Sequence, residues 1–183
     1  MPTVFRSTII DAPIETVWSW LRDFNGHERW HPAVEESHIE GVRAADQVGA
    51  VRTFRLATGA QLREQLLRLS DRDRSFTYCI LDSPIPLIGY VASVTLKRVT
   101  DGNRTFWNWH STFSTPPNLE PALERLVGEE IYERGFAASK RSPQLACRNQ
   151  CRCRHARVLR FVRRPVRFAA VPSRSMDTAV QMC

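Results

Sequence analysis

The sequence of 183 residues contains no long hydrophobic run. No stretch approaches the ~20 apolar residues of a membrane-spanning helix. The N-terminus opens directly into a strand pattern, from Thr3 to Ile10, instead of the apolar core of a signal peptide. We therefore expect a cytoplasmic protein without a transmembrane segment. The length suits one domain of ordinary size followed by a tail.

Motifs that would indicate a common catalytic or metal chemistry are also missing. The eight glycines form no glycine-rich phosphate loop, and no serine stands in a nucleophile elbow. His27, His31, His38 and His110 have no cysteine or acid at a spacing typical of zinc ligands. We therefore expect no metal site in residues 1–140 and no cofactor.

An excess of basic residues is absent from most of the chain and is found only at its end. The net charge is +7, but residues 1–140 carry 16 Lys and Arg against 18 Asp and Glu, a net charge of −2. Residues 141–183 carry ten Arg against the single acid Asp177, a net charge of +9. We therefore expect no nucleic-acid partner for residues 1–140. Cys79 is the single cysteine of residues 1–140, and its strand-like surroundings indicate a buried cytosolic thiol.

The apolar pattern predicts one strand, two short helices, six further strands and a long helix. After the first strand, Asp11 is expected to cap a helix of about three turns with Pro13 in its first turn. The segment Glu28–Pro32 is typical of a second helical turn. Turn residues then divide residues 34–114 into six strands, with breaks at 41–48, 58–59, 71–74, 83–88 and 101–103.

The last predicted element is an amphipathic helix from Leu119 to about Lys140, which follows Pro116 and Pro117. One face of a sheet of seven antiparallel strands must be covered by another element, and this helix is the one element long enough to do so. A strongly curved sheet and a single helix often cannot fill the space between them. The sequence therefore predicts an α+β domain with an internal hollow.

One hairpin places an ion pair on the inner face of the predicted sheet. If residues 57–59 form a three-residue loop with Gly59 in the left-handed conformation, Arg52 stands opposite Glu64. The same register puts Phe54 and Leu62 beside this pair. A buried ion pair is costly unless it is fully hydrogen-bonded, so the pair is a candidate polar anchor in the hollow. A register shifted by one residue would instead leave both side chains in solvent.

Several short segments, taken in order, match a known pattern. They are Ala12-Pro13 with Val17-Trp18, Trp30-His31-Pro32, Gly49-Ala50-Val51-Arg52, Arg63-Glu64, Ser83-Pro84 with Pro86 and Tyr90, Trp109 to Phe113, and Gly135-Phe136. Together they resemble the polyketide cyclase/dehydrase and lipid transport family (SRPBCC) of the START-like, birch-pollen-allergen-like superfamily. The resemblance covers Met1 to about Lys140.

This resemblance implies the helix-grip fold, in which a seven-stranded curved antiparallel sheet surrounds a long C-terminal helix. It also implies a ligand cavity, but no single chemistry. The family carries an Arg and a Glu at the positions of Arg52 and Glu64, which favours the inward register of this pair.

Strand alternation assigns side chains to the hollow, and the bulkier face of residues 104–114 is taken as the inner one. For each aromatic residue the alternative is an ordinary core position. The candidate ligand-binding residues are Trp30, Arg52, Phe54, Glu64, Tyr78, Tyr90, Val94, Trp107, Trp109, Phe113 and Ile131.

Two functions fit these residues. The first is a carrier or sensor that binds a small hydrophobic molecule, which is lipid-like, polyketide-like or aromatic, as a monomer or homodimer. The second is a cyclase or dehydratase that uses His31 or Glu64 as a base in the same cavity. For His31 the alternative is a structural role or a place at the mouth of the cavity.

Residues 141–183 form an Arg- and Cys-rich tail without Lys, Glu, Gly, Ile, Trp or Tyr. Such a bias is typical of a GC-rich gene read in a shifted frame, and we interpret the tail as disordered or frame-shifted. Two functional alternatives stay open. Cys147, Cys151, Cys153 and His155 could bind zinc, although their spacing is tight for a tetrahedral site. The segment 156–168 alternates Arg with apolar residues and could bind an anionic membrane surface or nucleic acid.

Overall fold

The computed structural model describes residues 1–142. Three expectations therefore lie outside the described residues: the tail as a disordered or frame-shifted segment, the zinc site at positions 147–155, and the basic segment 156–168. Within residues 1–142, no helix is long and apolar enough to cross a membrane.

The elements follow one another in the predicted order, and each predicted strand is present. In chain order they are β1 (Thr3–Ile10), α1 (Ile14–Leu21), the 3-10 helix η1 (Gly26–Arg29), β2 (Val34–Ile39), β3 (Val51–Leu56), β4 (Gln61–Ser70), β5 (Ser75–Asp82), β6 (Ile88–Val99), the 3-10 turn η2 (Asp101–Asn103), β7 (Arg104–Ser114), α2 (Glu120–Arg125), the π-helical segment η3 (Leu126–Glu133) and α3 (Arg134–Arg141).

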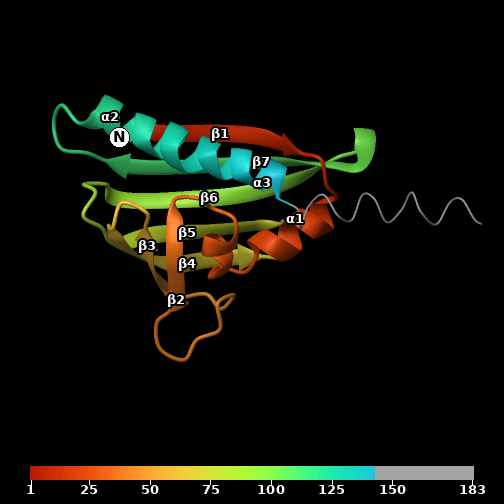
Figure 1. Cartoon of the computed structure of the whole chain (residues 1–183), viewed down its shortest axis with the longest axis horizontal. Helices are drawn as coiled ribbons and strands as arrows, with labels where there is room; N and C mark the ends of the chain where they lie inside the picture. Colours follow the sequence, from red (N-terminus) through yellow and green to blue (C-terminus); the bar gives the residue numbers. More distant parts are fainter. Residues whose placement is uncertain (143–183) are drawn as a thin grey trace, which may run out of the picture.

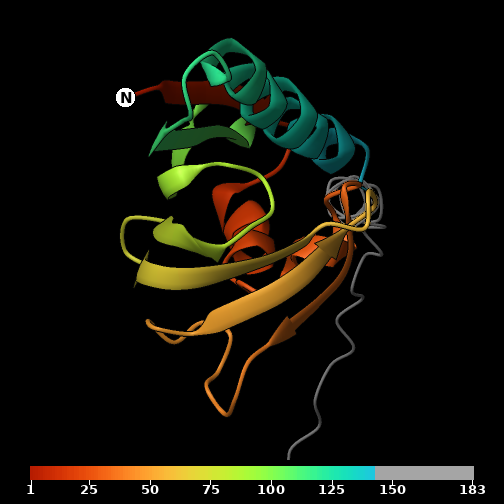
Figure 2. The same cartoon turned by 90° about the vertical axis from the view of Figure 1, so that its left-hand side faces the viewer.

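All seven strands form one antiparallel sheet in the order β1-β7-β6-β5-β4-β3-β2 (Figure 1). Register shifts interrupt the pairing of β2 with β3, of β4 with β5 and of β6 with β7. Such bulges bend strands, and Figure 2 shows the sheet curving with α1 and the C-terminal helix on its inner side. The predicted α+β architecture is confirmed.

The first helix is shorter than expected and begins later. Pro13 is its N-cap in extended conformation, with ψ 146°, and its carbonyl accepts the N–H groups of Thr16 and Val17. The prediction that Asp11 caps the helix and that Pro13 lies in its first turn is therefore wrong. A residue that precedes proline is disfavoured in helical conformation, which keeps Ala12 out of the helix, and the extended ψ of Pro13 makes Ile14 the first helical residue.

The C-terminal helix is present as predicted, but its middle third has π geometry. Elements α2, η3 and α3 follow one another without a break from Glu120 to Arg141. In a π-helix the backbone bonds join residues five apart. Tyr132, which lies five residues after the buried Val127 and four residues before the buried Phe136, is fully buried.

The interior consists of two apolar clusters. The larger one spans the sheet centre, α1 and the C-terminal helix, and the smaller one comprises Val34, Phe54, Leu56 and Leu62 on β2, β3 and β4. Ile80 and Ile85, both partly buried, pack against both clusters. The candidate site lies between these two clusters.

Candidate functional site

The predicted hairpin register is confirmed and places an ion pair inside the protein. Gly59 has φ +86°, the Leu56 N–H donates to the Ala60 carbonyl at 2.8 Å, and Arg52 pairs with Glu64 across β3 and β4. The side chains of Arg52 and Glu64 are only 5% and 6% exposed. The turn requires a residue in the left-handed conformation, which Gly59 supplies. This turn sets the strand register and therefore the face of the hairpin on which the charged side chains lie.

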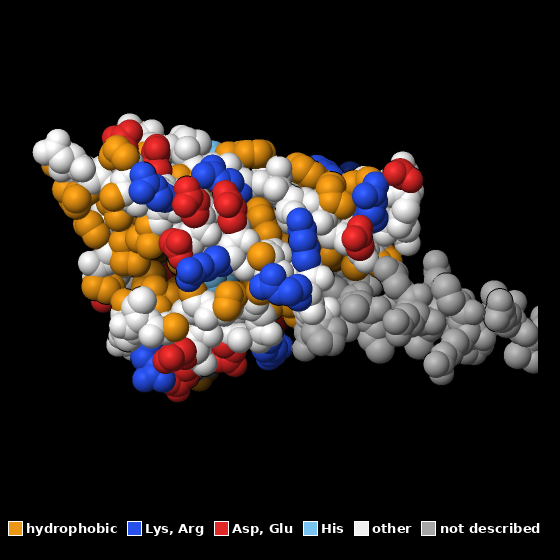
Figure 3. All heavy atoms as spheres, turned by 45° about the horizontal axis from the view of Figure 1, so that its top comes forward, with side chains coloured by type: hydrophobic (Ala, Val, Ile, Leu, Met, Phe, Trp, Pro, Cys, Tyr) orange, Lys and Arg blue, Asp and Glu red, His pale blue; other side chains and the backbone are white. Residues whose placement is uncertain are grey.

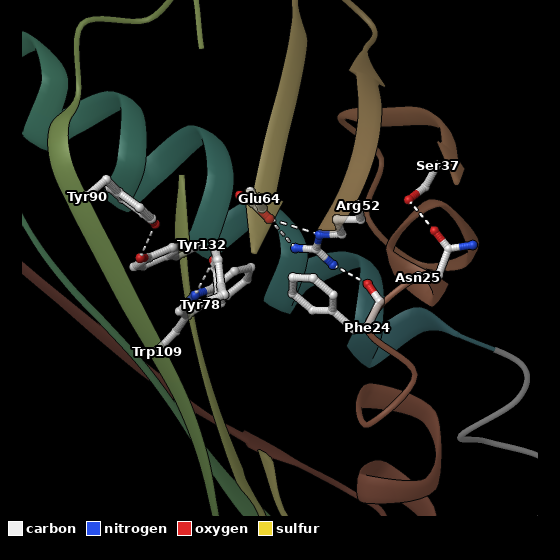
Figure 4. A network of polar contacts seen from close by, with 9 residues as sticks. All are labelled: Phe24, Asn25, Ser37, Arg52, Glu64, Tyr78, Tyr90, Trp109 and Tyr132. Carbon is white, nitrogen blue, oxygen red and sulfur yellow. Dashed lines mark hydrogen bonds and ion pairs between the residues drawn. The ribbon is translucent and has the colours of Figure 1, made fainter. Parts of the chain in front are cut away.

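The guanidinium of Arg52 is held on several sides. Its Nε and Nη2 donate to Glu64 Oε2 at 2.8 and 2.5 Å, and its Nη1 donates to the Phe24 carbonyl (Figure 4). Its Cζ also lies 4.0 Å from the centroid of the Phe24 ring. The chain between α1 and η1 thus contributes both a carbonyl and a ring face to the pair. These contacts offset the desolvation of a buried charge.

Only one of the two carboxylate oxygens of Glu64 accepts hydrogen bonds within residues 1–142. Both bonds from Arg52 end on Oε2, and no hydrogen bond within residues 1–142 uses Oε1. Burial raises the pKa of Glu64, while the charge and hydrogen bonds of Arg52 oppose that rise. Glu64 lines the larger cavity described below, so it brings a carboxylate acceptor to a predominantly apolar wall.

Tyrosine and tryptophan side chains form the next polar layer. The Tyr90 and Tyr132 hydroxyls lie 2.7 Å apart, and Trp109 Nε1 donates to the Tyr78 hydroxyl at 3.1 Å (Figure 4). The Trp109 ring stacks on that of Tyr132 at a centroid distance of 4.3 Å. Burial raises the pKa of each of the three tyrosines well above its ordinary value, so their hydroxyls are neutral.

His31 is buried and both of its ring nitrogens are occupied. Nδ1 accepts the Ala33 N–H at 3.2 Å, which leaves Nε2 as the protonated nitrogen that donates to the Ile131 carbonyl at 2.8 Å. Burial lowers the pKa of His31 to about 4. In this arrangement His31 anchors η3 to the segment after η1 and has no free nitrogen to act as a base. Of the two predicted bases, Glu64 alone keeps an atom without a hydrogen bond.

Two adjoining cavities lie between the sheet and the helices. The larger has a volume of about 50 Å³, enough for a few water molecules. It is lined by His27, His31, Val34, Phe54, Leu56, Leu62, Glu64, Tyr78, Ile80, Ile85, Leu87, Tyr90, Leu126, Val127 and Ile131. The smaller, of about 10 Å³, is lined by Leu21, Asp23, His27, Trp30, Arg52, Phe76, Tyr78, Val94, Trp107 and Trp109. His27 and Tyr78 line both cavities.

The structure divides the predicted ligand-binding residues among three places. The larger cavity is lined by Phe54, Glu64, Tyr78, Tyr90 and Ile131, and the smaller by Trp30, Arg52, Val94, Trp107 and Trp109, with Tyr78 shared. Phe113 lines neither cavity; it is fully buried in the core, where it stacks on Tyr90.

Sequence reasoning missed several lining residues. Ile85 and Leu87 belong to the connection between β5 and β6, a segment interpreted only as a break between strands. His27 was considered only as a metal ligand. Its spacing of four from His31 is a signal that could have revealed it, since residues four apart in a helical turn share a face.

One end of the molecule carries exposed apolar side chains. Leu81 at the end of β5, Ile88 at the start of β6 and Leu119 before α2 are each at least 40% exposed. Figure 3 shows hydrophobic side chains gathered at the left end of the molecule, where these strand ends and connections lie. The cavity-lining Ile85 and Leu87 belong to the same end of the sheet.

The family model for polyketide cyclase/dehydrase and lipid transport matches residues 1–142. The chain belongs to this family. Membership of the family is consistent with binding of a hydrophobic ligand. No curated protein is a significant match to the chain. Among residues 1–142, no group of three or more His, Cys, Asp and Glu side chains lies close enough together to hold a metal ion.

Solved structures of the same fold come from several bacteria. The chain is similar to XoxI from Bacillus cereus, with 27% identity, a TM-score of 0.68 and coverage of 76% of this chain and 94% of that one. It is similar to a protein from Bacillus thuringiensis, at 27% identity, TM-score 0.67 and coverage of 76% and 96%. It is also similar to a Thermobifida fusca protein, at 27% identity, TM-score 0.68 and coverage of 76% and 91%. The helix-grip fold implied by the sequence is confirmed.

Proposed function

We propose that this family member binds a small, predominantly apolar molecule in the cavity between the sheet and the C-terminal helix, as a carrier or sensor. The observation that carries the proposal is the cavity itself. It is a predominantly apolar space between two core clusters, and the carboxylate of Glu64, which has one oxygen without a hydrogen bond within the described residues, lies in its wall. Apolar burial supplies the affinity in such a site, and a few polar groups set the orientation. The Arg52–Glu64 pair faces the polar end of the ligand, while Phe54 and Tyr78 contact its apolar part.

Binding enlarges the cavity. A volume of about 50 Å³ is far below the roughly 300–1,000 Å³ of drug-sized ligand sites. Ile85, Leu87 and Ile131 line the cavity while being only partly buried, so these side chains can move outward at small cost. The ligand enters between the β5–β6 connection and η3, at the end where apolar side chains are exposed.

A competition experiment tests this proposal. The neutral dye Nile red is titrated into the full chain and displaced with a panel of alkanols, naphthols and sterols. Leu126→Trp fills the cavity and is expected to abolish dye binding, while Leu67→Trp, on the exposed face of β4, leaves it unchanged. Dye binding that survives Leu126→Trp at full strength would contradict the proposal.

The second candidate function is a cyclase or dehydratase acting in the same cavity. The free Oε1 of Glu64 and the raised pKa of this carboxyl favour it, because a base needs an unoccupied atom facing its substrate. Glu64→Gln distinguishes the two functions in a variant first shown to be folded. A carrier keeps most of its affinity, whereas an enzyme that depends on this base loses turnover.

A further inference from the structure

His27 is a buried imidazole that makes no hydrogen bond within the described part of the chain. His27 belongs to η1 and is only 6% exposed, and neither Nδ1 nor Nε2 has a hydrogen-bond partner among residues 1–142. Most buried polar groups of folded proteins are hydrogen-bonded, so an unpaired one that faces a cavity is available to a molecule in that cavity. His31, four residues later, has both nitrogens satisfied. Trp20 Nε1, Arg74 Nε, Trp107 Nε1 and Ser111 Oγ are the other buried polar side-chain atoms of the described residues without a partner, and among these residues His27 alone has two such atoms.

The imidazole lies where the two cavities meet. It lines both of them, and its ring centroid is 4.7 Å from that of Trp30, 5.8 Å from that of Phe54 and 6.2 Å from that of Trp109. Aromatic faces therefore surround the ring while offering its nitrogens no acceptor. A molecule in the cavity is the available partner for them.

The charges around the cavity restrict what that molecule can be. Arg52 and Glu64 are paired with each other, so together they contribute no net charge. Burial, then the charges of Arg52 and His31, lower the pKa of His27 well below its ordinary value, which keeps the ring neutral. Among the side chains that line the larger cavity, none is an unpaired cation. A ligand carboxylate would thus be buried without a counter-charge, which is costly.

We infer that His27 is the polar recognition residue of the cavity, and that the ligand is a neutral apolar molecule carrying a hydroxyl group, an alcohol or a phenol. This inference rests on the proposed function and names its ligand class. A neutral imidazole offers one N–H donor and one acceptor, and a hydroxyl group can accept from the first or donate to the second. The unused Oε1 of Glu64 provides a second acceptor on the same cavity wall.

The test compares three probes of one shape by isothermal titration calorimetry with the full chain at pH 7: 2-naphthol, 2-naphthoate and naphthalene. One satisfied neutral hydrogen bond corresponds to about tenfold in affinity. The wild type is expected to bind 2-naphthol about tenfold more tightly than naphthalene, and 2-naphthoate the most weakly.

Variants at two histidines assign this preference to His27. His27→Phe is expected to bind naphthalene as the wild type does, but to lose the preference for 2-naphthol. His27→Gln keeps a donor and an acceptor and retains part of it. His38→Phe changes an exposed histidine of β2 and leaves all three affinities unaltered. Circular dichroism confirms that each variant is folded before it is titrated.

Two outcomes would overturn the inference. If 2-naphthoate binds as tightly as 2-naphthol, or if His27→Phe keeps the full preference for 2-naphthol, His27 does not recognise the ligand. The proposed function would still stand in that case, because Leu126→Trp would still abolish binding of all probes. If the wild type binds none of the three probes, the inference and the proposed function are both contradicted.

Discussion

Replacing Arg52 by methionine isolates the energetic role of the buried ion pair. The substitution keeps the length of the side chain but removes the two bonds to Glu64 and the bond to the Phe24 carbonyl. It leaves a carboxylate that is only 6% exposed without a counter-charge. Breaking a buried pair in this way costs about 3–5 kcal/mol. We expect Arg52→Met to lower the free energy of unfolding by that amount at pH 8.

A double-mutant cycle separates the pair from its surroundings. Glu64→Leu alone leaves the guanidinium uncompensated, whereas the double variant removes both charges and fills the space with apolar atoms. The double variant is expected to lose less stability than the two single variants together. Its free energy of unfolding should exceed the value expected from adding the two single losses by about 2 kcal/mol or more. Urea denaturation followed by circular dichroism measures all four proteins. Arg55→Met, which breaks the exposed contacts of Arg55 with Glu35 and Glu36, serves as the control and costs less than about 1 kcal/mol.

The pH dependence of Arg52→Met gives a second readout. Without the guanidinium, the pKa of Glu64 rises further, so the folded variant holds a proton that its unfolded state releases. Its stability therefore increases relative to the wild type as the pH falls from 8 to 5. Effects of the single substitutions that add to within about 0.5 kcal/mol, with no dependence on pH, would refute the coupling of the two residues.

Three further perturbations follow from particular contacts. Because the pKa of His31 is about 4 when folded and near 6.5 when unfolded, the unfolded state binds the extra proton, so stability falls as the pH drops below 6.5. His31 alone accounts for a loss of about 2 kcal/mol by pH 5, which denaturation at pH 7 and 5 measures against His31→Asn. A Cβ on Gly135 would lie 2.9 Å from the His31 ring, so Gly135→Ala is expected to lower the free energy of unfolding by about 1–3 kcal/mol. A Cβ on Gly128 would meet only the flexible end of Arg6, so Gly128→Ala is expected to leave the stability unchanged or to increase it. Thr105→Val removes a buried bond of 2.7 Å to a backbone carbonyl and lowers the free energy of unfolding by about 1–3 kcal/mol.

Each of these expectations has a contrary result. An equal loss of stability between pH 7 and 5 in the wild type and His31→Asn would remove the histidine from the pH response. Gly135→Ala and Gly128→Ala of equal stability would show that the close approach to His31 is unimportant. A Thr105→Val variant as stable as the wild type would show that its buried hydroxyl contributes nothing net.

Most of the sheet could be predicted because its signals are local. Gly59 and the alternation on either side of it fixed the pairing of Arg52 with Glu64, since a slip by one residue would have moved apolar side chains into solvent. The same alternation placed Trp107 and Trp109 inside, as the structure confirms. Resemblance to the family added the topology that joins these strands, which local patterns do not contain.

What could not be predicted depends on contacts between distant segments. The π geometry of η3 is not contained in the apolar pattern of the sequence, which predicts an ordinary helix over these residues. His27 becomes a cavity residue only because η1 packs beside Phe54 and Trp109. The volume of the cavity likewise depends on rotamers and on the curvature of the sheet, which the bulges set.

The central claim is that this cavity holds a small apolar molecule, and native mass spectrometry tests it most directly. The full chain is purified without detergent from its own host, beside Leu126→Trp, in which the cavity is filled. The account predicts a bound neutral species on the wild type that is absent from Leu126→Trp. A wild type that carries no ligand, or a ligand that Leu126→Trp retains as fully, would contradict it.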